Sequence, residues 1–182
     1  MNRLQEKYNK EIAPALVKEL KRKSVMNVPK LEKIVVNAGI GRIFKEAPKV
    51  KAIESQFSAI VGQKAIITKA KKSVAGFKIR EGMPIGIKVT LRKDRMYEFF
   101  DRFISIVLPR TRDFSGISIK SFDQSGNISI GIKDCSVFPE LDSREGGENF
   151  PLEITIVMTS KNEEESKALL THFGFPLKKG KK

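Results

Sequence analysis

Hydrophobic residues recur along this chain with the period of an α-helix in four segments. In the first, Leu4, Tyr8, Ile12, Leu16 and Leu20 are spaced by four, with Lys and Glu between them, which predicts an amphipathic helix. Three further helices are expected from similar spacing. They are Ala47–Val61, with Pro48 in the first turn and Gly62 at the end; a helix from an Asp94 N-cap through Met96, Tyr97, Phe99, Phe100, Phe103, Ile106 and Val107 to Pro109; and Asn162–Phe173.

Other segments favour strands, and some of them alternate with period two. Ile87, Val89 and Leu91 would face one side and Lys88, Thr90 and Arg92 the other, as in an antiparallel sheet with one buried and one free face. Strands mixed with helices predict the α+β class: a single domain over residues 1–182, with an antiparallel sheet backed by helices on one face. The expected strands are Leu31–Ala38, Lys64–Lys69 and Leu152–Thr159, and two hairpins pair Phe77–Arg80 with Ile85–Arg92 and Ile117–Phe122 with Ile128–Ile132.

The charge of the chain is strongly positive and unevenly distributed. The whole sequence has 35 Lys and Arg against 21 Asp and Glu, but residues 1–93 hold 22 of these basic residues and only 7 acidic ones. The remaining half, residues 94–182, is close to neutral with 13 basic and 14 acidic residues, and four of its basic residues lie in a short tail at 178–182 that follows residues 94–177. Because so much like charge repels itself unless an anion offsets it, the first half predicts a polyanionic partner.

Several kinds of chemistry are disfavoured by what the chain contains. One cysteine, Cys135, permits no intrachain disulfide or zinc cluster, and one histidine, His172, is expected to be a structural or surface residue. The sequence has no cofactor motif, and Asp123 is assigned to a hairpin turn rather than to a calcium loop. Met1–Lys10 lacks the apolar core of a signal peptide, so we expect a cytoplasmic protein with no membrane span.

The segment between Thr68 and Pro84 combines cations, glycines and one aromatic residue. Lysine and arginine neutralise phosphates, and glycine lets the backbone come close to them, so this segment predicts an RNA-contacting loop. Phe77 has two open interpretations, stacking on an exposed base or packing in the core. Amide, hydroxyl and guanidinium groups nearby offer hydrogen bonds that read RNA shape: Asn37, Gln63, Thr90 and Arg92.

Two other functions would suit parts of the sequence. The cationic first helix fits a peripheral membrane protein lying on anionic lipid, although it lacks tryptophan. The carboxylates Asp142, Glu145 and Glu148 fit an RNA-modifying enzyme, although no nucleophile or metal ligand accompanies them. A binding protein without catalytic activity therefore remains the preferred hypothesis.

Four stretches of the chain resemble one protein family. They are GQKAIITKAKKSVAGFKIREGMPIGIKVTLR at Gly62–Arg92, LEKIVVNAGIG at Leu31–Gly41, MYEFFDRFISIVLPRTRDFSG at Met96–Gly116 and HFGFP at His172–Pro176. Together they are similar to bacterial large-subunit ribosomal protein five. The resemblance implies a monomer within the ribosome that binds 5S rRNA in the central protuberance and contacts the P-site tRNA. It also implies contacts with 23S rRNA, with neighbouring large-subunit proteins and with a small-subunit head protein.

The same resemblance assigns residues to these contacts. Against the family pattern, Ser115 replaces a usual arginine and the segment Ser143–Phe150 has an unusual Gly-Gly-Glu-Asn sequence, both of which bear on the bridge between subunits. The implied residues are Asn37, Gln63, Lys64, Lys88, Thr90 and Arg92 for 5S rRNA; Lys71, Lys72, Ser73, Gly76, Phe77, Lys78 and Arg80 for tRNA; and Arg110, Arg112, Asp113 and Ser115 for the subunit bridge.

Overall fold

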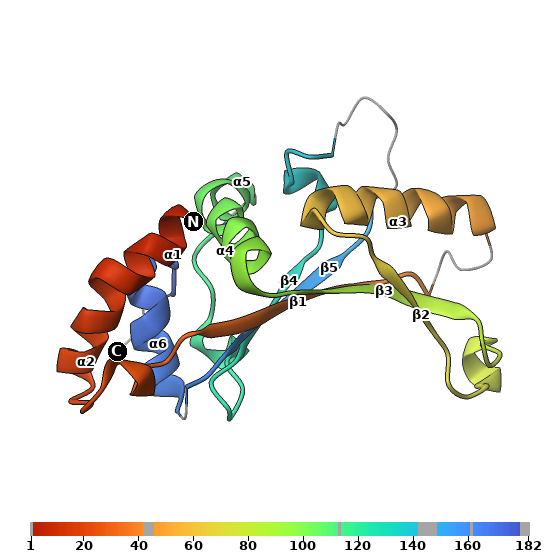
Figure 1. Ribbon diagram of the computed structural model, residues 1–182. Coiled ribbons are helices and arrows are strands. Elements are labelled where there is room, and N and C mark those ends of the chain that lie inside the picture. Colours follow the sequence, from red (N-terminus) through yellow and green to blue (C-terminus); the bar gives the residue numbers. More distant parts are fainter. Residues whose placement is uncertain (1, 42–45, 113, 142–148, 161, 179–182) are drawn as a thin grey trace. The chain divides into compact units, whose positions relative to one another are not determined.

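A computed structural model describes residues 2–41, 46–112, 114–141, 149–160 and 162–178 (Figure 1). These residues group into two compact units. Unit 1 consists of Met1–Ile34, Leu91–Ile130 and Thr155–Lys182, and unit 2 consists of Val35–Thr90 and Gly131–Ile154. The expected single domain over the whole chain stays a prediction.

One five-stranded sheet supplies the strands of both units. Its order is β2-β3-β1-β5-β4, and β2 pairs antiparallel with β3, with Ile66 opposite Lys88 and Thr68 opposite Gly86. One face is buried, by Ile34, Val36, Ile87, Val89 and Ile154 among others, whereas the alternate residues are half-buried or exposed. The predicted α+β class is therefore confirmed. The strands are β1 (Leu31–Gly39), β2 (Ile66–Lys69), β3 (Pro84–Leu91), β4 (Ile128–Ile132) and β5 (Leu152–Met158).

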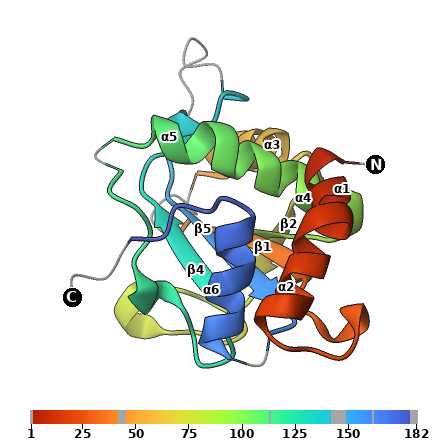
Figure 2. The same cartoon turned by 90° about the vertical axis from the view of Figure 1, so that its left-hand side faces the viewer.

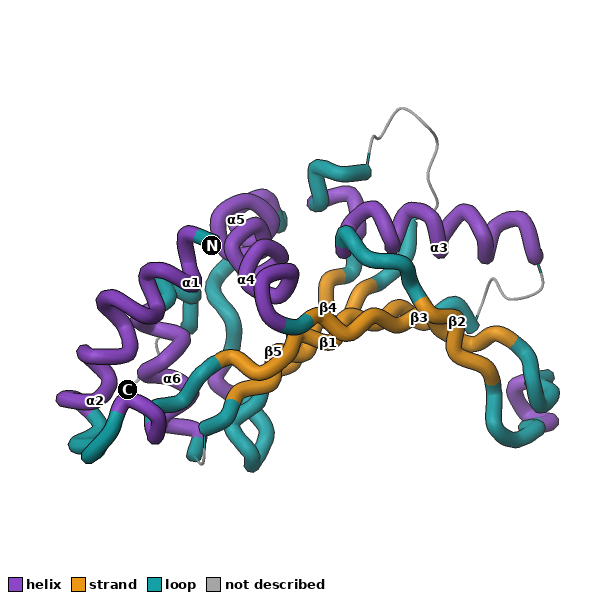
Figure 3. Tube along the Cα trace, viewed as in Figure 1, coloured by secondary structure: helices purple, strands orange, loops and turns teal. Residues whose placement is uncertain are grey.

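Unit 2 is built around helix α3 (Ala47–Val61), which lies along one side of β2 and β3 in Figure 3. Ile53, Phe57 and Ile60 are fully buried, and the Phe57 ring lies 6.5 Å from that of Phe150 between centroids. Gly62 ends the helix with φ of 72°, a left-handed conformation that glycine adopts without steric cost. The helix thereby turns directly into β2 and fixes where that strand begins.

Unit 1 contains the other helices, which lie close together in Figure 2. α1 (Arg3–Lys7) and α2 (Ala13–Glu19) are joined by a π-helical segment (Tyr8–Ile12), and α4 (Lys93–Arg102) and α5 (Leu108–Arg110) by another (Phe103–Val107). Each π segment directly precedes a turn that contains a proline, Pro14 or Pro109. Proline has no N–H and its ring clashes with a carbonyl one turn earlier, so a locally wider turn lets the helix continue. The last helix is α6 (Glu163–His172).

The structure corrects three details of the expected elements. Phe77–Arg80 is not a strand: Ala75–Phe77 forms a 3₁₀ turn, and the partner of β3 is β2. Asp94 is not an N-cap, because α4 begins at Lys93 and places Asp94 in its first turn. The aromatic helix also does not stop at Pro109, since α5 continues to Arg110.

The second expected hairpin is only partly formed. Its turn is present, with the Asp123 carboxylate accepting hydrogen bonds from the backbone N–H groups of Ser125 and Asn127 at 2.9 and 2.7 Å. Its first arm is not a strand: Ile119–Ser121 forms a 3₁₀ turn, and only Phe122 pairs with β4, opposite Ile128.

No helix in the described part of the chain is long and apolar enough to cross a membrane.

Candidate nucleic-acid interface

A shallow hollow lies on the free side of the sheet in unit 2. It has a volume of about 380 Å³ and is called the sheet hollow below. Lys64, Ile66 and Thr68 alternate along the chain into β2, and Lys88 and Thr90 alternate along β3, so side chains of both strands meet on one face. The lining residues are Gln63, Lys64, Ile66, Thr68, Lys88, Val89 and Thr90.

The sheet hollow combines two cations with groups that form hydrogen bonds. Lys64 and Lys88 are exposed, while Gln63 and Thr90 are half-buried, so their polar groups are held near the surface. Gly86, opposite Thr68 on β3, leaves room for the Thr68 side chain: a Cβ atom at Gly86 would lie only 2.9 Å from the Thr68 hydroxyl oxygen. Ammonium groups suit phosphates, and amide and hydroxyl groups suit ribose hydroxyls and base edges, so the surface has the chemistry for RNA.

Two further residues assigned to 5S rRNA lie outside the lining of this hollow. In unit 2, Asn37 on β1 donates a hydrogen bond of 2.8 Å from its side-chain amide to the carboxylate of Glu153 on β5. In unit 1, Arg92 is exposed and its guanidinium lies 3.7 Å from the Glu32 carboxylate. Both contacts are exposed and weak enough for RNA to replace them. The hollow therefore collects four of the six assigned residues: Gln63, Lys64, Lys88 and Thr90.

The connection between β2 and β3 is a compact loop, called the basic loop (residues 70–83). At its base, the N–H of Ala70 donates to the Met83 carbonyl at 2.8 Å and the N–H of Gly82 donates to the Ala70 carbonyl at 3.0 Å. Nearer the tip, Val74 and Ile79 exchange two backbone hydrogen bonds of 2.9 and 3.2 Å. The loop thus has an internal framework that presents its side chains outward.

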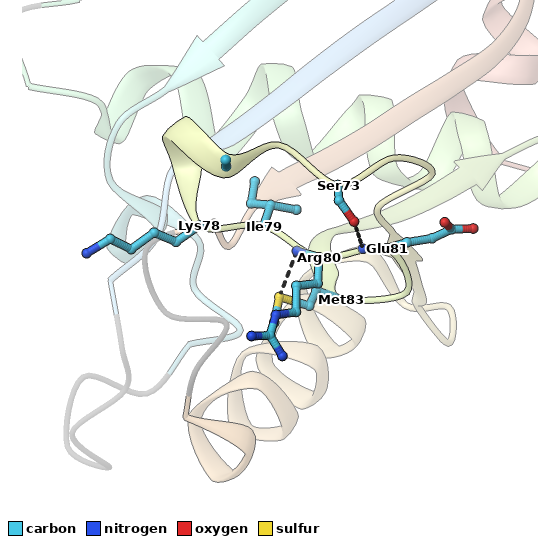
Figure 4. Close-up of a pocket in the computed structure, with 7 residues that line it drawn as sticks. Ser73, Lys78, Ile79, Arg80, Glu81 and Met83 are labelled. Carbon is cyan, nitrogen blue, oxygen red and sulfur yellow. Dashed lines mark hydrogen bonds between the residues drawn. The ribbon is translucent and has the colours of Figure 1, made fainter.

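Side chains of the basic loop surround an open hollow of about 860 Å³ (Figure 4). Ser73 accepts a hydrogen bond of 3.0 Å from the backbone N–H of Glu81, which joins the two sides of the loop. Lys71, Lys72, Lys78 and Arg80 are exposed, and none of them forms an ion pair with any residue that the structure describes. The loop therefore carries uncompensated cations on a defined backbone.

Phe77 lies at the tip of the basic loop and is 76% exposed. This exposure decides between the two interpretations of Phe77 in favour of a residue outside the core. It follows Gly76 in the 3₁₀ turn and precedes Lys78, whose φ of 54° is unusual for a residue with a side chain. The turn therefore holds an aromatic ring and a cation next to each other at the tip.

The residues assigned to the subunit bridge follow the aromatic helix of unit 1. Arg110, Arg112 and Ser115 are exposed, whereas Asp113 lies outside the described residues. Of the segment 143–150, only Asn149 and Phe150 are described, and of the basic tail only Lys178 is.

The alternative functions find little support in the described side chains. The membrane hypothesis needs an available apolar stripe, but Leu4, Ile12 and Leu16 are buried in the core of unit 1.

Burial raises the pKa of the Cys135 thiol, so it stays protonated at neutral pH and is a poor nucleophile. His172 is half-buried and its Nε2 lies 2.8 Å from the Glu19 carboxylate, which suits the expected structural or surface histidine. Asp142, Glu145 and Glu148, the carboxylates of the enzyme hypothesis, lie outside the described residues.

Sequence reasoning did not select three lining residues of the sheet hollow. One is Val89, which is buried, and the other two are Ile66 and Thr68 on β2. Ile66 is 70% exposed, although an isoleucine in a strand is normally expected to face the core. The register with β3 was the missing information, because Ile66 stands opposite the exposed Lys88 rather than a buried residue. A period-two count that starts from Lys64 would have found both residues.

Two protein-family models match this chain. The model described as ribosomal protein L5 matches residues 24–80, and the model for the C-terminus of the same ribosomal family matches residues 84–177. The second match alone covers more than half of the 182 residues. The family resemblance of the four sequence stretches is thereby confirmed. The chain belongs to the ribosomal protein L5 family, whose members are structural, non-enzymatic, rRNA-binding proteins of the large ribosomal subunit.

Proposed function

We propose that this protein binds 5S rRNA through the sheet hollow, with Asn37 and Arg92, and helps to attach 5S rRNA in the central protuberance of the bacterial large subunit. Support comes mainly from one observation: Gln63, Lys64, Lys88 and Thr90, assigned to 5S rRNA by resemblance, line the same hollow. Two lysines give affinity for phosphates, whereas the Gln63 amide in the turn before β2 and the Thr90 hydroxyl on β3 offer directed hydrogen bonds. Such a surface binds most tightly an RNA whose phosphates, base edges and ribose hydroxyls lie opposite these protein groups.

The experiment is a comparison of dissociation constants for 5S rRNA and for a size-matched unrelated RNA. Both are measured with the full chain in magnesium buffer over a salt series around physiological ionic strength. We expect a preference for 5S rRNA of about a hundredfold that persists as salt increases, because shape recognition adds to the electrostatic attraction. Equal affinities that fall together with salt would show a generic cationic surface and contradict the proposal.

The basic loop is assigned to the P-site tRNA. Its four exposed cations suit the phosphates of a tRNA arm, and the exposed Phe77 ring suits an unstacked base or a ribose surface. The internal hydrogen bonds of the loop keep these groups near one another before any RNA arrives. Pre-organisation lowers the entropy that binding costs, which is useful for a contact made transiently during translation.

Removing the ring of Phe77 is expected to weaken the tRNA contact without affecting 5S rRNA binding. For Phe77→Ala we expect about a tenfold loss of tRNA affinity, in the range that one base stacked on an aromatic ring contributes. The measurement is tRNA binding to large subunits reconstituted with the variant, next to the 5S rRNA dissociation constant of the free protein. Val25→Ala, which truncates an exposed apolar residue of unit 1, is the control and is expected to change neither value. A loss of 5S rRNA affinity in Phe77→Ala would contradict the division of roles.

The remaining contacts complete the proposed assembly. Arg110, Arg112 and Ser115 are exposed and are assigned to the bridge with the small-subunit head protein, together with Asp113. 23S rRNA and neighbouring large-subunit proteins are the other partners, and the protein is present as a monomer within the cytoplasmic ribosome. The excess of cations in residues 1–93 supports this picture, because several RNA partners can offset it.

A further inference from the structure

An apolar side chain occupies the most polar part of the proposed RNA surface. Ile66 is 70% exposed and lies among Lys64, Lys88 and Thr90 in the lining of the sheet hollow. A single exposed aliphatic residue is common on protein surfaces and needs no explanation by itself. Its position in a hollow lined by cations and hydrogen-bonding groups does need one, since a hydroxyl or a third cation would serve phosphate binding better.

The register of the sheet fixes the surroundings of Ile66. It stands directly opposite Lys88, so the two side chains rise from the same face at neighbouring positions. β2 is an edge strand, where an exposed apolar residue carries a risk of pairing with other chains. Lys64, two residues before the strand, and Lys69, its last residue, are charged neighbours that oppose such pairing. An exposed isoleucine at this position therefore has a cost in the free protein.

The chemistry of Ile66 selects one part of an RNA. Methyl groups gain nothing from phosphates, but they pack well on the flat face of a base. In a double helix these faces are covered by neighbouring bases, and only in loops, bulges and ends are they open to a protein. The hollow of about 380 Å³ is in the size range of sites that hold small organic groups.

We infer that the sheet hollow receives the base of one unpaired nucleotide, with Ile66 packed against its face. Lys64 and Lys88 hold the phosphates on either side of it, and Gln63, Thr68 and Thr90 bind its edge and its ribose hydroxyl. Ile66 is therefore a specificity-determining residue: it favours RNAs that present an unstacked base at this point over regular duplexes. The inference rests on the proposed function and adds to it the kind of nucleotide that is recognised.

The test compares Ile66→Thr with Val25→Thr in 5S rRNA binding by the full chain. Threonine keeps the branched Cβ that suits a strand but removes apolar contact, and Ile66 is too exposed for the fold to depend on it. We expect the dissociation constant of Ile66→Thr to be about tenfold higher than that of the wild type. The slope of log affinity against log salt should be the same for both proteins, because the variant keeps every cation that meets a phosphate. Val25, which is 56% exposed and lies outside the hollow, provides the matched control with no expected change.

A second readout identifies what Ile66 touches. With methyl-labelled isoleucine in the 5S rRNA complex, we expect NOEs from the Ile66 δ1 methyl group to aromatic base protons; Ile66→Val assigns the signal. If the wild type prefers 5S rRNA but Ile66→Thr binds equally well, or the methyl group contacts only ribose protons or no RNA, the inference is overturned while the proposed function stands. If the wild type itself shows no preference for 5S rRNA, the proposed function fails and the inference fails with it.

Discussion

Replacing both lysines of the sheet hollow by glutamate, Lys64→Glu with Lys88→Glu, is expected to weaken 5S rRNA binding roughly a thousandfold. Each substitution removes a cation that neutralises a phosphate and places a carboxylate against the same phosphate, and like charges forced together at an interface cost several kcal/mol. The slope of log affinity against log salt should also become shallower, by about 0.7 to 0.9 for each phosphate that is no longer neutralised. Both quantities come from one titration series. Lys64 and Lys88 are exposed, so the fold itself is not expected to change.

A matched control separates the position of the charges from their sum. Lys120→Glu with Lys133→Glu also reverses two lysines outside the core, and it lowers the net charge of the chain by the same amount. Neither residue lines the sheet hollow or belongs to the basic loop. We expect this variant to lose less than about tenfold in affinity, through the weaker long-range field alone. Equal losses in the two variants would mean that only the total charge attracts the RNA.

The helices and most strands of this protein were predictable because their signals are local. Ala47–Val61 has the bounds expected of it, since Pro48 and Gly62 mark its ends in the sequence itself. The free, basic face of β3 could be predicted for the same reason: alternation between Ile87 and Arg92 is visible without any partner strand. Local patterns therefore sufficed for these elements and for the part of the candidate site that lies on β3.

The predictions that failed, for the strand at Phe77–Arg80 and for the side chain of Ile66, depend on contacts between residues that are distant in the sequence. Phe77–Arg80 alternates like a strand, but the backbone hydrogen bonds that Ala70 forms with Met83 and Gly82 close a loop around it, and β3 pairs with β2 instead. The partner of β3 is β2, and only that register shows Ile66 to be exposed. A short alternating run between glycines is equally compatible with a hairpin arm and with a folded loop. Pairing with distant strands decides between the hairpin arm and the folded loop, and the local sequence pattern does not reveal that pairing.

The aromatic residues of the C-terminal HFGFP stretch show how a family motif can serve stability rather than binding. Phe173 and Phe175 are buried in unit 1, where both pack on Phe100 of α4. The Phe100 ring is fully buried. Its centroid lies 5.4 Å from that of Phe173 in an edge-on arrangement and 6.1 Å from that of Phe175 in a stacked one. Such clusters contribute through buried area and through favourable ring geometry. The motif therefore anchors the end of the chain to the aromatic helix.

Phe100→Ala should accordingly lower the free energy of unfolding by about 3 to 5 kcal/mol, the range for a large ring removed from a rigid core. Equilibrium urea unfolding of the free protein measures it. Phe77→Ala makes the same chemical change at an exposed ring and is expected to alter the free energy of unfolding by less than about 0.5 kcal/mol. Similar values for the two variants would show that the ring cluster contributes little to stability.

The folded fraction of Phe100→Ala should still bind 5S rRNA with wild-type affinity, because Phe100 does not line the sheet hollow. An affinity loss that exceeds the unfolded fraction would instead place the aromatic cluster in the recognition of RNA.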